Sequence, residues 1–151
     1  MSPLAVADAD QITAITAEIF AAMVDGEEGF LVPWSEGSAA VADPLHAWVD
    51  MHAENGNRVQ LTTDAGTADD LARALLGMSA DEKVPLGDLV DAFGEVANVI
   101  GGNLKALLPV QGRLTMPEVS RQSPSLTGAV QIDEVALAWR GRPLIITVWT
   151  I

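Results

Sequence analysis

Residues 86–108 read LGDLVDAFGEVANVIGGNLKALL, and their apolar positions repeat with the period of an α-helix. Pro85 precedes this pattern and Pro109 follows it, so we expect a helix that begins near Pro85 and ends at about Leu108. Projection at 100° per residue places a continuous apolar stripe on one side, made of Leu89, Phe93, Val96, Ile100, Leu104 and Leu107. The stripe predicts that this side of the helix is buried against a β-sheet.

The opposite side of the helix has an unusual composition, consisting of Asp91, Gly94, Glu95, Asn98, Gly101, Gly102 and Lys105. The three glycines and the asparagine on this side have low helix propensities, and together they disfavour the helix by about 3 kcal/mol. One interpretation is that the glycines let a neighbouring strand or helix approach closely. The other is a docking face, in which Glu95 and Asn98 project together at positions i and i+3 and the glycines leave space for another protein.

The residues before this helix alternate between apolar and polar. Leu45, Ala47, Val49 and Met51 share one face, and Val59 and Leu61 follow after Asn55-Gly56. Asn-Gly between two such runs predicts a β-hairpin. On the other face stand His46, Trp48, Asp50 and His52, which we interpret as a half-solvated strand face. Alternate positions along one strand lie too far apart to share one metal ion.

The other elements follow from similar patterns. Residues 8–24 predict an amphipathic helix that stops at Asp25-Gly26, and Thr67 is expected to cap a helix that runs to about Met78. Residues 27–44 predict mostly loop, with brief strand pairing at residues 30–32. Further strands are predicted at residues 113–120, 129–139 and 144–151, the last two joined around residues 140–142. This order predicts an α+β fold of two layers, an antiparallel β-sheet packed against helices.

Length and composition limit the function. The chain has 151 residues, of which 49% are hydrophobic, so residues 1–151 are expected to form a single domain with its own core. Its net charge of −13 opposes binding to nucleic acid or to anionic membranes. The sequence has no cysteine and two histidines, which excludes thiolate metal sites and most catalytic triads. The acidic N-terminal stretch lacks the features of a signal peptide, so a cytoplasmic location is expected.

The spacing Asp91-x-x-x-Glu95-x-x-Asn98, followed by Gly101, Gly102 and Asn103 and later by Pro117, resembles the signature of the CheC/CheX/FliY chemotaxis phosphatases. A single copy of the Glu-x-x-Asn element, with none in the first helix, is similar to the CheX branch. The run from Gly56 to Leu61, the short helix ending at Met78 and the three closing strands also resemble that family. Pro117 follows Asn98 a few residues sooner than in the family pattern, and Pro124 is a less convincing substitute.

The resemblance implies a CheC/CheX-like fold and a phosphatase of two-component signalling in chemotaxis. Its substrate would be the aspartyl phosphate of a CheY-like response regulator. The implied catalytic residues are Asn98, which would orient the attacking water, and Glu95, which would pair with a lysine of the partner. The implied partner-binding residues are Asp91, Gly94, Gly101, Gly102 and Pro117. The chain would need no metal or other cofactor of its own, because the Mg²⁺ would belong to the phosphorylated partner.

Two alternatives remain open from the sequence. The same face could hold a receiver domain without hydrolysing its phosphate. A structural homo-oligomer could instead use the face formed by Gly94, Asn98, Gly101 and Gly102 as its seam. A homodimer through a sheet edge is a further expectation for a CheX-like protein, and the apolar ending at residues 144–151 could supply that edge or could be part of the core.

Overall fold

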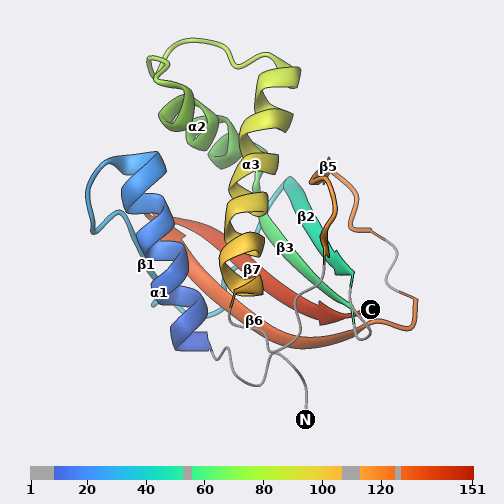
Figure 1. Ribbon diagram of the computed structural model, residues 1–151. Helices are drawn as coiled ribbons and strands as arrows, with labels where there is room; N and C mark the ends of the chain where they lie inside the picture. The colour runs from blue at the N-terminus through green and yellow to red at the C-terminus, as the bar shows by residue number, and fades with distance from the viewer. Residues whose placement is uncertain (1–8, 53–55, 107–112, 125–126) are drawn as a thin grey trace.

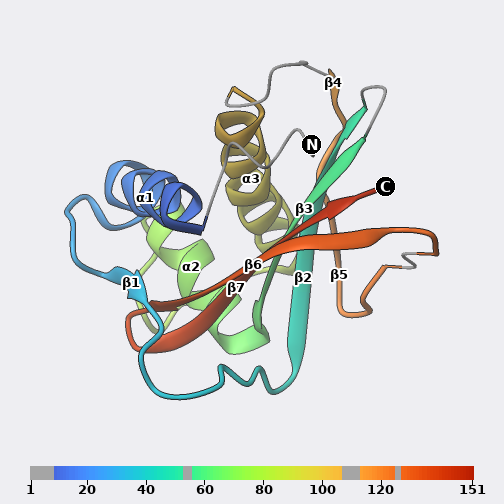
Figure 2. The same ribbon diagram turned by 90° about the horizontal axis from the view of Figure 1, so that it is seen from below.

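The structure is a computed structural model that describes residues 9–52, 56–106, 113–124 and 127–151. Its helices are α1 (Ala9–Ile19), the π-helical turn η2 (Phe20–Asp25), α2 (Ala65–Leu76) and α3 (Leu86–Lys105). Its strands are β1 (Leu31–Pro33), β2 (Pro44–His52), β3 (Asn57–Asp64), β4 (Arg113–Leu114), β5 (Glu118–Ser120), β6 (Val130–Trp139) and β7 (Arg142–Thr150). The helices lie on one side of the sheet (Figures 1 and 2), so the predicted two-layer α+β fold is confirmed.

The sheet is antiparallel, with the strand order β1-β6-β7-β3-β2-β4, and β5 also pairs with β2. The hairpin predicted over residues 45–64 is confirmed, with Pro44 opposite Asp64 and Met51 opposite Asn57. Asn55 of its turn lies outside the described residues. The hairpin of β6 and β7 turns at Arg140 and Gly141, which have φ values of 51° and 82°. Two successive positive φ angles are typical of the tight turns that match strand twist.

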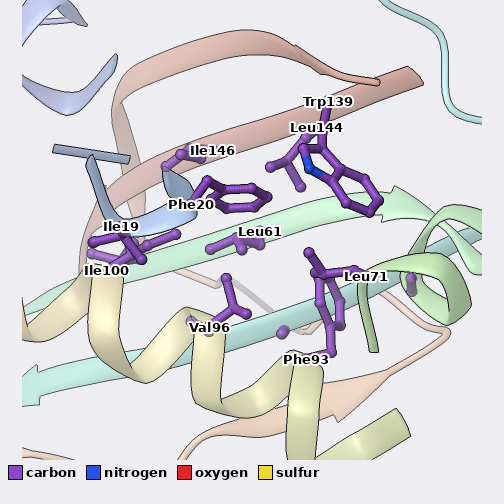
Figure 3. Close-up of a cluster of buried hydrophobic side chains, with 14 of the residues drawn as sticks. Ile19, Phe20, Leu61, Leu71, Phe93, Val96, Ile100, Trp139, Leu144 and Ile146 are labelled. Atoms are coloured by element: carbon purple, nitrogen blue, oxygen red, sulfur yellow. The ribbon is translucent and has the colours of Figure 1, made fainter. Parts of the chain in front are cut away.

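The apolar stripe of α3 is buried as predicted. Phe93, Val96, Ile100 and Leu104 each have 0% exposure, whereas Leu107 lies outside the described residues. Figure 3 shows Phe93, Val96 and Ile100 directed toward side chains of the sheet such as Leu61. Phe20 of η2 packs edge-on against Trp139, with ring centroids 6.1 Å apart. This burial fixes the rotation of α3, so Asp91 and Glu95 on its other side are exposed.

Two predicted boundaries are corrected. The helix assigned to begin at Thr67 begins instead at Ala65, and Asp64 caps it: the Asp64 carboxylate accepts hydrogen bonds from the Thr67 N–H and hydroxyl, each at 2.8 Å. Asp64 ends β3 within reach of the first turn, so it takes the position that Thr67 was expected to occupy. The strand predicted over residues 113–120 is divided into β4 and β5, and Pro117, which has no N–H to donate to a neighbouring strand, lies between them.

The face of β2 that was predicted to be half solvated is more buried than expected. His46 and Trp48 are each 8% exposed. Arg58 lies over the Trp48 ring and forms a 2.6 Å ion pair with Asp50, and Thr62 lies 2.8 Å from Nδ1 of His46. Cross-strand partners on β3 therefore cover this face. The side chain of His52 is not among those described.

Burial of His46 predicts a pH-dependent stability. Desolvation lowers the pKa of this imidazole from its usual 6.5, because burial disfavours the charged form. The unfolded state therefore binds more protons once the pH falls below about 6.5. The contribution to the free energy of unfolding is complete above that pH and is lost as the pH falls toward the lowered pKa.

Urea unfolding between about pH 8 and pH 5 tests this effect against His46→Gln, a variant with no imidazole to protonate. The wild type should lose stability relative to the variant as the pH falls below about 6.5, since carboxylate titration affects both chains alike. Two parallel stability curves across this range would rule out the role given to His46.

No helix in the described part of the chain is long and apolar enough to cross a membrane.

Candidate functional site

The predicted catalytic residues, Glu95 and Asn98, lie on α3 outside its buried apolar stripe. Glu95 is exposed and Asn98 is half-buried, and because α3 is continuous through both, these side chains three positions apart project in the same direction. Asp91 is exposed one turn before Glu95. Within the described residues, the side chains of Glu95 and Asn98 make no hydrogen bond or ion pair with the rest of the chain. A carboxylate and an amide are thus available together for a partner.

The glycines of α3 face this chain's own strands. A Cβ atom at Gly94 would lie 3.4 Å from the Pro117 ring, and one at Gly101 would overlap Cγ2 of Val49 in β2. Gly94 and Gly101 are both buried, and Gly102 is half-buried, with its Cβ position 3.6 Å from Leu114. The space beside Gly94 and Gly101 is therefore filled by this chain rather than left for a partner. The close-packing interpretation accounts for these two residues.

This packing makes Gly101→Ala a destabilising substitution. The added methyl group collides with a branched side chain in the core, and we expect a net loss of about 1–3 kcal/mol in the free energy of unfolding. This loss exceeds the gain of up to about 1 kcal/mol that alanine brings over glycine within a helix.

The matched control is Gly87→Ala, because no atom lies within 4 Å of a Cβ at Gly87 in the same helix. That variant should be as stable as the wild type or slightly more so. Urea unfolding compares the three chains, and equal stabilities of Gly101→Ala and Gly87→Ala would show that the close approach of Val49 does not matter.

The segment from Leu114 to Pro117 forms one border of the site. Leu114 packs near Gly102 and Pro117 packs at Gly94, so this segment runs antiparallel to α3. These two glycines bracket Asn98, one turn away on either side. Despite its short spacing from Asn98, Pro117 is therefore held against the helix that carries Glu95 and Asn98. Figure 1 shows β5, which follows Pro117, beside α3.

The exposed side of α3 is negatively charged in its N-terminal half. Asp88, Asp91 and Glu95 are exposed, and α3 has no basic residue before Lys105. This row favours a partner that presents a cation and disfavours small free anions.

The candidate residues line none of three hollows in the described part of the chain. Two hollows of about 320 Å³ and one of about 220 Å³ are lined by residues of α1, η2, β1, α2, β6 and neighbouring loops, and none of the three is lined by a residue of α3. Small-molecule sites are usually concave pockets. An exposed helix face with an acidic row suits a protein partner better than a small substrate.

No group of three or more His, Asp or Glu among the described residues could hold a metal ion. The expectation that Mg²⁺ belongs to the partner stays a prediction.

Solved structures of chemotaxis proteins share this fold. CheX of Vibrio vulnificus is similar with a TM-score of 0.74 at 16% identity, over 100% of this chain and 99% of that one. CheX of Desulfovibrio desulfuricans is similar with a TM-score of 0.71 at 18% identity, over 95% of this chain and 98% of that one. The CheX chain in a CheX-CheY-BeF3-Mg²⁺ complex of Borrelia burgdorferi is similar with a TM-score of 0.67 at 14% identity, over 95% of this chain and 97% of that one. At these identities the likeness shows the fold alone. No curated protein sequence matches the chain.

The chain therefore has the fold of the CheX proteins. The model of the family "Chemotaxis phosphatase CheX" matches residues 46–134, which is more than half of the 151 residues and includes α3 and Pro117. The chain belongs to the CheX family of chemotaxis phosphatases.

Proposed function

We propose that this chain hydrolyses the aspartyl phosphate of a CheY-like response regulator, with Asn98 and Glu95 as the catalytic residues. The observation that carries this proposal is the pair of exposed Glu95 and half-buried Asn98, whose side chains have no partner among the described residues and project from one side of α3 beside Pro117. Membership of the CheX family and the likeness to a CheX chain solved with CheY support it. A docking face of this shape fits a protein substrate.

Asn98 is suited to position water. Its amide offers both a donor and an acceptor, so it can hold a water molecule in line with the phosphorus atom of a docked aspartyl phosphate. Attack by that water forms a new P–O bond and breaks the bond to the aspartate, which releases a carboxylate and inorganic phosphate. Positioning worth about 2.7 kcal/mol accelerates the reaction about a hundredfold, so no general base is required.

Glu95 is suited to hold the partner. Its exposed carboxylate lies one turn from Asp91 in the acidic row of α3 and can pair with a lysine of the receiver. That contact would fix the orientation of the receiver so that the phosphoryl group meets Asn98. The chemistry that Mg²⁺ supplies, charge neutralisation on the phosphoryl oxygens, would come with the partner. Asp91 and Pro117 border the same surface and complete the proposed contact.

The test is the decay of phosphorylated CheY-like receivers in Mg²⁺ with substoichiometric wild-type chain. Each chain should remove phosphate from many receiver molecules, which gives an accelerated first-order decay. The main competing function is receiver binding without hydrolysis, and it predicts complex formation with unchanged decay. Residues 144–150 supply no sheet edge, because β7 is paired with β3 on one side and with β6 on the other, so the core alternative holds for this stretch. A homodimer and a cytoplasmic location stay predictions.

A further inference from the structure

Two large apolar side chains stand out by their exposure. Met116 is 83% exposed and Leu86 is 75% exposed, the highest values among the large hydrophobic residues that the structure describes. Val90 is 39% exposed and belongs to the same helix as Leu86. Exposed apolar side chains that gather at one place usually mark a binding surface.

The position of Met116 follows from its neighbours in the chain. Pro117 on one side packs against Gly94, and Leu114 on the other packs near Gly102. Thr115 is held to β2, since its N–H donates to the Asp50 carbonyl and its hydroxyl accepts from the Asp50 N–H. Met116 therefore lies on the segment that passes the turn of α3 carrying Asn98, and its side chain is left in solvent.

Leu86 and Val90 continue this apolar surface along the helix. Leu86, Val90 and Gly94 are spaced by four residues, so they form one ridge of α3. Pro117 packs on the Gly94 end of that ridge. The ridge therefore leads toward the segment that holds Met116. We call Leu86, Val90 and Met116 the apolar rim.

We propose that the apolar rim binds an apolar surface of the phosphorylated receiver, with Met116 as its anchor beside Asn98. This inference rests on the proposed function and names a second part of its docking surface. The acidic row of Asp88, Asp91 and Glu95 lies on the same helix and favours a partner with a cation. A receiver that pairs its lysine with Glu95 brings its neighbouring surface onto the rim. The flexible thioether of methionine adapts well to such a surface.

The experiment measures binding and turnover separately. Binding uses CheY-like receivers activated with Mg²⁺ and beryllium fluoride, an aspartyl phosphate analogue that is not turned over, and turnover uses the phosphorylated receivers. Met116→Ser should raise the dissociation constant and KM about tenfold, with kcat within about twofold of the wild type. Val130→Ser is the matched control, because Val130 is 61% exposed on β6 and lies outside the rim. It should bind and turn over like the wild type.

Each outcome decides the proposal. Loss of affinity in Met116→Ser but not in Val130→Ser supports the anchor. Equal affinities of the wild type and Met116→Ser overturn the proposal that the rim binds the receiver. The proposed function is decided separately, by whether the wild type accelerates dephosphorylation. If the wild-type chain binds the receivers without turning them over, the proposed phosphatase activity is overturned. The dissociation constant of Met116→Ser then still decides whether the rim binds the receiver. A wild-type chain that binds none of them overturns both.

Discussion

Asn98→Ala is expected to lower the kcat for receiver dephosphorylation at least about a hundredfold and to leave KM nearly unchanged. The reason is that alanine removes the amide that would hold the attacking water, while the docking contacts of Glu95 remain. Because Asn98 lies within α3, alanine should keep the stability unchanged or raise it by about 0.5 kcal/mol. Steady-state decay of a phosphorylated receiver measures both kinetic constants.

Asn103→Ala is the matched control on the same helix. Asn103 is exposed, and its amide donates to the Val99 carbonyl at 2.8 Å rather than facing a partner. This variant should retain wild-type kcat and KM. A similar loss of activity in both asparagine variants would point to a general effect on α3 and against a water-positioning role for Asn98.

Glu95→Ala is expected to raise KM about tenfold or more, since a charge-assisted hydrogen bond contributes about 1.5–3 kcal/mol. The effect should shrink at high salt, because ions screen the pairing of an exposed carboxylate with a lysine. Measurements of kcat/KM at low and at high ionic strength therefore check the effect.

Glu36→Ala removes the same charge at an exposed loop position outside α3 and serves as the control. It should change kcat/KM little at either salt concentration. If Glu36→Ala and Glu95→Ala lower kcat/KM equally, net charge rather than a specific contact of Glu95 explains the loss.

Much of the fold could be predicted from periodicity and turn residues. The apolar stripe of residues 86–108 identified the helix that packs on the sheet, and Asn55-Gly56 identified the hairpin of β2 and β3. The resemblance in the spacing of Glu95 and Asn98 identified the family. These features depend on local sequence, so they can be recognised from one amino-acid sequence.

Features that depend on distant contacts could not be predicted. To predict the cap at Asp64, one would need to know where β3 ends relative to α2. The burial of His46 and Trp48 depends on their cross-strand partners in β3. The glycines of α3 left two interpretations, and only the positions of Val49 and Pro117 distinguish them. The exposure of Met116 was missed because nothing in the local sequence distinguishes it from a buried strand residue.

The central claim is that Asn98 makes this chain a catalyst of receiver dephosphorylation. It is tested most directly by the decay rate of one phosphorylated CheY-like receiver in Mg²⁺, measured alone, with catalytic amounts of the wild type and with Asn98→Ala. We expect the wild type to accelerate decay and Asn98→Ala to leave it at the rate of the receiver alone, although both chains bind the beryllium fluoride form equally. Acceleration by Asn98→Ala equal to that of the wild type would contradict the account.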